Sequence, residues 1–201
     1  MLDLQPPILY QITSGTTTAQ TTSNDPQFLS ILHSVQVAVD KGVSLFQIRE
    51  KNLSGRVLYE LTSRAAVITR GSSTRLLVND RSDIARAAGA DGVQLTSQSL
   101  PASVVRETCG PKFLIGVSTH SREEVLAARA QGADFVIFGP VFETESKMAF
   151  GAPQGLERLR AVCSEAGSFP VLAIGGISLE NMQSCLDAGA RGVAAIRMFQ
   201  T

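Results

Sequence analysis

Eight short apolar runs recur along the chain, each rich in Val, Ile and Leu and bounded by Gly, Pro, Asn, Asp or Ser. Runs of this length and composition are typical of strands that are buried on both faces of a parallel sheet. The predicted strands cover residues 7–13, 45–49, 75–80, 92–96, 113–119, 135–141, 170–177 and 192–196.

The segments between these runs place apolar residues at helical spacing, and several begin with a recognisable start signal. Asp25 precedes a proline, Ser54 stands where a capping hydroxyl is expected, and Ser121 is followed three residues later by Glu124, the pattern of a capping box. The predicted helices cover residues 25–42, 53–71, 121–133, 156–167 and 178–190.

Strands that alternate with helices over the whole chain predict a parallel sheet with crossover helices. Eight repeats favour a single α/β domain over residues 1–201, a compact (β/α)8 TIM barrel. An open doubly wound sheet is the alternative, but no Gly-x-Gly-x-x-Gly turn follows the first strand. Only five residues follow the last strand, so we expect the last outer helix to be missing or supplied by a neighbour.

Composition narrows the class of protein. The 18 basic and 18 acidic residues balance, so nothing predicts binding to nucleic acid or to a membrane surface. No apolar run approaches the roughly 20 residues of a membrane span, and the acidic start lacks the features of a signal peptide. Three cysteines in no metal-binding spacing, Cys109, Cys163 and Cys185, predict reduced thiols in a cytoplasmic protein.

The second predicted strand begins apolar and ends in a polar cluster. In SLFQIREKN, alternation places Gln47, Arg49 and Lys51 on one face. A strand running out into solvent would explain this stretch alone, but other strands end in the same way. Polar residues also follow at Asn79, Asp80, Arg81, Ser118, Thr119, His120, Thr144, Ser146, Lys147 and Arg197. Because active sites of such barrels lie at the carboxyl ends of the strands, these residues predict a shared mouth for an anionic ligand.

Two features of the loops bear on a phosphate site. Gly175 and Gly176 would let the backbone approach a ligand closely, and Ser178 is expected to open the next helix, where N–H groups favour anions. A tight turn between strand and helix would also explain the two glycines. The Thr/Ser-rich residues 13–24 predict a mobile loop.

Seven stretches resemble the thiamine phosphate synthase/TenI-like superfamily, in matching order over essentially the whole chain. They are FQIREK, LLVNDR, ADGVQL, IGVSTHS, ADFVIFGPVFETESK, VLAIGGI and AGARGVAAI. Each is weak alone, but their order and spacing identify the chain as a member of this superfamily of (β/α)8 barrels.

The synthase branch joins a hydroxymethylpyrimidine diphosphate to a thiazole phosphate, releases diphosphate and needs Mg²⁺. The resemblance implies that Gln47 contacts the pyrimidine and that Asp80 binds the metal. It implies that the diphosphate contacts Asn79, Ser118 and three candidate catalytic cations, Arg49, Lys51 and Lys147. It also implies that the thiazole phosphate contacts Thr144, Ser146, Gly175 and Gly176. The expected partners are therefore small phosphate and diphosphate substrates.

Three positions depart from the synthase pattern. Ser99 replaces an Asp that would be a second Mg²⁺ ligand, which predicts a weakened metal site. In that stretch the chain is more similar to the TenI-like thiazole tautomerases, yet Pro140 stands where their general base, a His, is expected. Arg197 replaces a small residue and would either contact phosphate or fill the pocket.

Three hypotheses therefore stay open: a thiamine phosphate synthase, which we favour, a TenI-like tautomerase, and a non-catalytic binder of thiazole phosphate. His120 is a candidate acid or base that fits either enzyme, or a residue with a structural role. The missing outer helix would leave apolar surface exposed, which is compatible with a homodimer.

Overall fold

Strands and helices alternate as predicted in the computed structural model, which describes residues 5–143 and 153–199. The strands are β1 (Ile8–Ile12), β2 (Leu45–Ile48), β3 (Arg75–Asn79), β4 (Gly92–Leu95), β5 (Leu114–Thr119), β6 (Phe135–Phe138), β7 (Val171–Ile174) and β8 (Gly192–Ala195). The helices are α1 (Pro26–Asp40), α2 (Gly55–Thr69), α3 (Ser82–Ala87), α4 (Ala102–Cys109), α5 (Arg122–Ala130), α6 (Gly155–Ala166) and α7 (Met182–Asp187).

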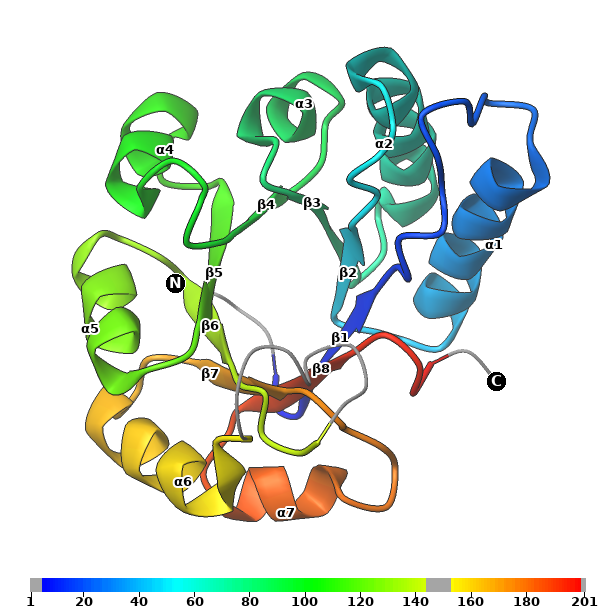
Figure 1. Cartoon of the computed structure of the whole chain (residues 1–201). Coiled ribbons are helices and arrows are strands. Elements are labelled where there is room, and N and C mark those ends of the chain that lie inside the picture. The colour runs from blue at the N-terminus through cyan, green and yellow to red at the C-terminus, as the bar shows by residue number, and fades with distance from the viewer. Residues whose placement is uncertain (1–4, 144–152, 200–201) are drawn as a thin grey trace.

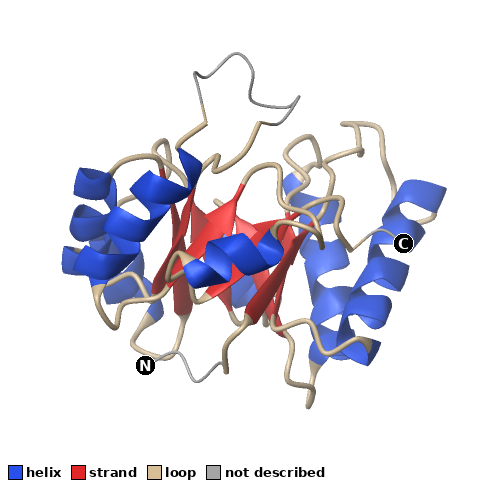
Figure 2. Cartoon of the chain, turned by 90° about the horizontal axis from the view of Figure 1, so that it is seen from below, coloured by secondary structure: helices blue, strands red, loops and turns tan. Residues whose placement is uncertain are grey.

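The eight strands form a closed parallel barrel in sequence order, with the helices around it (Figures 1 and 2). β8 closes the ring by pairing with β1, where Tyr10 lies opposite Ala194. The predicted (β/α)8 barrel is therefore confirmed, and the open doubly wound sheet was the wrong alternative. Every strand runs in the same direction, so all the carboxyl ends meet at one mouth.

The predicted helix start signals are observed at two of the long helices. The Ser54 hydroxyl accepts the Val57 N–H at 3.3 Å, and the Ser121 hydroxyl accepts the Glu124 N–H at 3.2 Å. The predicted start of the last helix was wrong. α7 begins only at Met182, because the Asn181 side chain accepts the Ser178 N–H at 2.9 Å and holds residues 178–181 in a turn.

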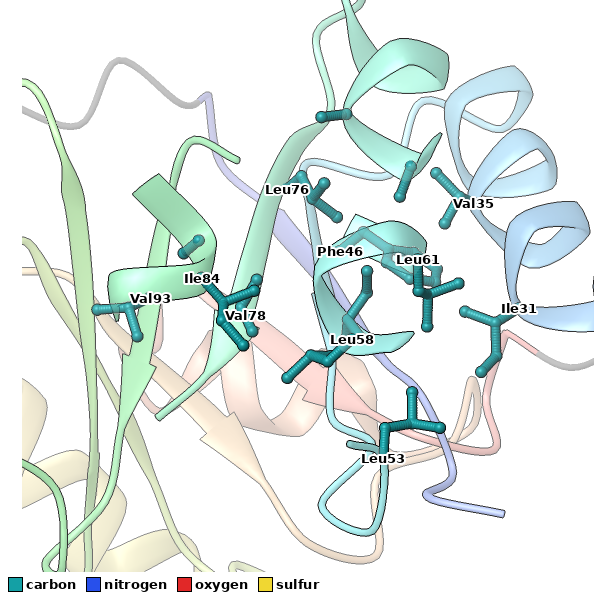
Figure 3. Close-up of a cluster of buried hydrophobic side chains, with 14 of the residues drawn as sticks. Ile31, Val35, Phe46, Leu53, Leu58, Leu61, Leu76, Val78, Ile84 and Val93 are labelled. Atoms are coloured by element: carbon teal, nitrogen blue, oxygen red, sulfur yellow. The ribbon is translucent and has the colours of Figure 1, made fainter. Parts of the chain in front are cut away.

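The core is divided by the barrel wall into an inner and an outer part. The inner part includes Tyr10, Leu77, Phe135 and Leu172. The outer part fills the space between strands and helices. Figure 3 shows a section of it, where side chains of α1, α2 and α3 pack against β2, β3 and β4. Strands buried on both sides explain why their sequences are apolar without strict alternation.

No helix follows β8 within the described part of the chain, in agreement with the prediction. Phe199, in the segment after β8, packs instead against the outer cluster that contains α1. Between this segment, α1 and the outer face of β1 lies a cavity of about 560 Å³, whose lining includes Gln11, Phe46 and Phe199. The homodimer stays a prediction.

Candidate active site

The predicted polar residues of β2, β3 and β5 lie at the mouth, and a buried network connects them. The Gln47 Nε2 amide donates to Asn79 Oδ1 at 3.2 Å. Ser118 belongs to the same network through Gln94 of β4, whose Nε2 donates to the Ser118 hydroxyl at 3.2 Å. The structure therefore brings together three residues that the sequence placed on separate strands.

The base of this network is a tyrosine that the sequence analysis missed. The Tyr10 hydroxyl lies 3.1 Å from Gln47 Oε1 and 3.1 Å from Gln94 Oε1. Complete burial raises the pKa of Tyr10 well above its ordinary value, so the phenol stays protonated. Its ring packs edge-on against Phe135, with 5.8 Å between the centroids.

A glycine in β5 creates the space for Gln94. A Cβ at Gly116 would lie 2.3 Å from Gln94 Oε1 and 2.4 Å from the Phe135 ring. Any larger residue would thus displace the amide or the ring. The sequence could have indicated Gln94 as a candidate, because it is a polar residue in the middle of an apolar strand.

Arg49 lies beside the loop that connects β1 to α1. A Cβ at Gly15 would lie 3.6 Å from Arg49 Nη1, and Gly15 adopts a positive φ of 76°. The Arg49 backbone N–H donates to the Thr13 hydroxyl at 2.9 Å. These contacts fix where the loop and the arginine meet.

Glu50, which follows Arg49, holds this loop and was not predicted as a functional residue. Its carboxylate is only 3% exposed and accepts the Gly15 N–H at 3.1 Å, the Thr17 N–H at 3.1 Å and the Thr17 hydroxyl at 2.6 Å. Asn52 adds a hydrogen bond to the Thr17 carbonyl oxygen at 3.2 Å. Composition predicted a mobile loop, whereas its first residues are held by a buried carboxylate.

Two cations at the mouth have no acidic partner among the described residues. Arg49 is half-buried and Lys51 is exposed, and neither forms an ion pair with any residue of the ranges 5–143 and 153–199. Arg81 differs, because its guanidinium binds Asp83 through both carboxylate oxygens, at 2.9 and 2.6 Å. This pair lowers the pKa of Asp83. Arg49 and Lys51 are therefore the cations of this region that stay available to an anion.

Asp80 is exposed at the end of β3 and has a positive φ of 66°, unusual for a residue other than glycine. Its backbone N–H donates to the Gln94 carbonyl oxygen at 2.9 Å, which fixes this turn to β4. Its carboxylate accepts no hydrogen bond from the residues that the structure describes. It is thus free to act as a ligand.

The candidate metal site has few protein ligands among the described residues. The described residues contain no cluster of three or more His, Cys, Asp or Glu side chains that could hold a metal ion. The Ser99 hydroxyl, at the position of the expected second carboxylate, accepts the Thr96 N–H at 2.8 Å. Asp80 alone fits a Mg²⁺ ion that brings its own waters and substrate phosphate oxygens, as this ion commonly does.

Gly175 and Gly176 have positive φ values of 100° and 63°. A Cβ at Gly175 would lie 2.4 Å from Pro140 Cβ, and one at Gly176 would lie 2.8 Å from Phe142 Cβ. Packing against the segment after β6 therefore requires both glycines, whether or not a phosphate binds there. We expected Ser178 to open the last helix at a point where N–H groups favour an anion. This expectation was wrong, because the Ser178 N–H already donates to the Asn181 side chain.

Of the other predicted residues, three lie outside the described part of the chain and two are exposed. Thr144, Ser146 and Lys147 lie outside the described residues. His120 is exposed, and its backbone N–H donates to Glu124 at 2.6 Å. Arg197 is exposed after β8.

The three cysteines are free thiols, as predicted. Burial raises the pKa of Cys163 and of Cys185 to about 11, which makes both poor nucleophiles. Among the helices described, none is both long and apolar enough to cross a membrane.

Comparisons with known proteins show what the whole chain is similar to. A family model described as thiamine monophosphate synthase matches residues 18–199. A relative from Geobacter sulfurreducens, provisionally named a thiamine-phosphate synthase, is 49% identical over 166 residues, which are 83% of this chain and 78% of the relative. The thiamine-phosphate synthase of Chlorobium phaeovibrioides is 45% identical over 155 residues, 77% of this chain and 74% of the relative. A solved thiamine phosphate pyrophosphorylase from Pyrococcus furiosus, 36% identical, has a TM-score of 0.78 and covers 94% of this chain and 85% of its own.

Proposed function

Because the chain belongs to the thiamine monophosphate synthase family, we propose that it is a thiamine-phosphate synthase that joins hydroxymethylpyrimidine diphosphate to thiazole phosphate and releases diphosphate. The observation that carries this proposal is the mouth itself. Arg49 and Lys51, which form no ion pair within the described part of the chain, lie there with an amide and a hydroxyl held by the network below. Such a set of donors suits a highly charged leaving group.

For the individual residues we propose the roles that the family resemblance implies. Gln47 contacts the pyrimidine, while Arg49, Lys51, Asn79, Ser118 and Lys147 bind the diphosphate. Thr144, Ser146, Gly175 and Gly176 bind the thiazole phosphate. The glycine turn supports this last assignment only in part, because packing against Pro140 and Phe142 already requires residues without a Cβ at both positions.

The proposed reaction breaks the C–O bond between the pyrimidine methylene and the diphosphate. The electron pair of that bond leaves with the diphosphate, and the thiazole nitrogen supplies the pair for the new C–N bond. No protein nucleophile takes part. The protein lowers the barrier by stabilising the negative charge that develops on the leaving oxygen, so its cations and hydrogen-bond donors are the catalytic groups.

The proposal includes Mg²⁺ held by Asp80 and by substrate oxygens. When bound, the ion would add positive charge at the departing diphosphate. Ser99 stands where the resemblance implies a second carboxylate, and its hydroxyl already accepts the Thr96 N–H. We expect Ser99→Asp to lower the Mg²⁺ concentration that gives half-maximal rate. An unchanged Mg²⁺ dependence would remove this position from the metal site.

The tautomerase alternative needs a proton-transferring side chain after Gly139. Pro140 occupies that position, is buried, and has no group that titrates. His120 is a weak substitute, because it lies exposed at the end of another strand. These observations favour the synthase over the tautomerase. A non-catalytic binder differs from the synthase in turnover, which the formation of thiamine phosphate measures.

A pair of arginine variants tests the anion site. Arg49→Gln should weaken calorimetric binding of inorganic diphosphate by about tenfold or more, the loss expected for one charge-assisted hydrogen bond. Arg81→Gln is the matched control, because that guanidinium is bound to Asp83. Equal affinity in the two variants would contradict the assignment of Arg49.

A further inference from the structure

The network below the mouth consists of two arms that start from one hydroxyl. One arm runs from Tyr10 through Gln47 to Asn79, and the other runs from Tyr10 through Gln94 to Ser118. Tyr10, Gln47 and Gln94 are each at most 1% exposed, so water does not compete for the contacts among these three residues.

Each arm has a direction, because an amide has a donor end and an acceptor end. Both glutamines direct Oε1 toward the Tyr10 hydroxyl and Nε2 toward the mouth. A phenol has one proton, and both amide oxygens lie 3.1 Å from the Tyr10 hydroxyl, so the two amides share that proton in a three-centre hydrogen bond. The buried neutral phenol favours acceptor oxygens on its side of the network.

The direction of the arms decides what the mouth presents to a ligand. The Asn79 Oδ1 atom accepts from Gln47, which leaves the NH₂ group of Asn79 to donate. The Ser118 oxygen accepts from Gln94, which leaves the hydroxyl proton of Ser118 to donate. If either glutamine turned over, its arm would end in an acceptor, which repels an anion.

We propose that Tyr10 is a positioning residue that orients both glutamine amides and thereby makes Asn79 and Ser118 hydrogen-bond donors toward the diphosphate. This inference rests on the proposed function for the identity of the anion. It adds a role for two residues, Tyr10 and Gln94, that lie below the ligand and need not contact it. Gly116 is part of the same arrangement, since only a glycine leaves space for the Gln94 amide.

A purely structural role for Tyr10 makes a different prediction. Loss of the phenol would then reduce stability, and it would reduce ligand affinity by the same factor whether or not Ser118 is present. In the positioning role the two residues depend on each other, because Ser118 is a dependable donor only while the tyrosine orients Gln94. A double-mutant cycle distinguishes the two roles.

The experiment measures binding of inorganic diphosphate, with Mg²⁺ present, by calorimetry on four proteins: the unmodified chain, Tyr10→Phe, Ser118→Ala and the double variant. Tyr10→Phe keeps the ring that packs against Phe135. We expect each single change to weaken binding by about tenfold, and Ser118→Ala to cost less than about threefold once Tyr10 is Phe.

Ile8→Val is the control, because Ile8 is a buried residue of β1 that is not in the network. Ser118→Ala should cost the same in that background as in the unmodified chain. Equal costs in the Tyr10→Phe background, or full affinity in Tyr10→Phe, would overturn the inference. Coupling in a protein that makes no thiamine phosphate would uphold the inference and reject the synthase. If the unmodified chain does not bind diphosphate, both the inference about Tyr10 and the proposed synthase function are rejected.

Discussion

The buried carboxylate of Glu50 provides the sharpest test of how the mouth is built. Glu50→Gln keeps the size of the side chain but replaces one oxygen by an NH₂ group. The carboxylate accepts three hydrogen bonds, one at Oε1 from Gly15 and two at Oε2 from Thr17. An amide oxygen can replace only one of the two carboxylate oxygens. At least one backbone N–H then faces an NH₂ group, with no acceptor.

The size of the effect follows from these contacts. With the amide oxygen at the Thr17 side, the variant loses the Gly15 bond, which is worth about 2 kcal/mol to a charged acceptor. The other two bonds weaken by about 1 kcal/mol each when the acceptor becomes neutral. Burying an amide instead of a charge returns about 1–2 kcal/mol. The net loss is about 2–3 kcal/mol, which corresponds to about a hundredfold easier opening of the loop.

Hydrogen exchange of the Gly15 and Thr17 amides measures this opening directly, since both N–H groups donate to Glu50. Both amides should exchange about a hundredfold faster in Glu50→Gln. Asn52→Ala is the control, because it removes one hydrogen bond to the same loop from an exposed side chain and should accelerate exchange by only about tenfold or less. Exchange rates in Glu50→Gln within threefold of the unmodified chain would refute the reasoning.

Three further predictions concern other parts of the chain. Thr62 is fully buried in α2, and its hydroxyl has no hydrogen-bond partner among the residues that the structure describes. Thr62→Val should therefore raise the free energy of unfolding in urea by about 1 kcal/mol; a loss of stability would show that the hydroxyl is satisfied. Asp80→Asn should remove Mg²⁺-dependent turnover. Its melting temperature should stay within about 2 °C of that of the unmodified chain, because Asn tolerates a positive φ. Full activity of this variant would exclude Asp80 as the metal ligand. At pH 8, iodoacetamide should label Cys109 before the other two cysteines. A pKa of about 11 leaves only about one thiolate in a thousand at Cys163 and Cys185. Equal labelling of all three cysteines in peptide mass maps would contradict the burial of Cys163 and Cys185.

The barrel was predictable because its elements have strong local signals. Apolar runs such as 135–138 are buried on both faces, so their composition alone identifies them as strands. The start of α7 was not predictable in the same way. Both Ser178 and Asn181 are good turn and cap residues, and only the tertiary structure shows that the Asn181 side chain accepts the Ser178 N–H.

The sequence indicated the polar residues that end the strands, but not the residues that hold them. Gln47, Arg49 and Asp80 became candidates because polar groups recur at the ends of several apolar strands. Tyr10 and Glu50 were missed, because their roles depend on partners more than thirty residues away in sequence. Sequence periodicity indicates which side of a strand a residue faces, but it does not identify the residue on another strand that receives its hydrogen bond.

Formation of thiamine phosphate is the measurement that tests the central proposal most directly. The purified protein is incubated with hydroxymethylpyrimidine diphosphate, thiazole phosphate and Mg²⁺, and the product is oxidised to thiochrome and detected by fluorescence. We expect product that disappears with EDTA and in Arg49→Gln but persists in Arg81→Gln. Absence of product from folded protein that binds both substrates would contradict the synthase.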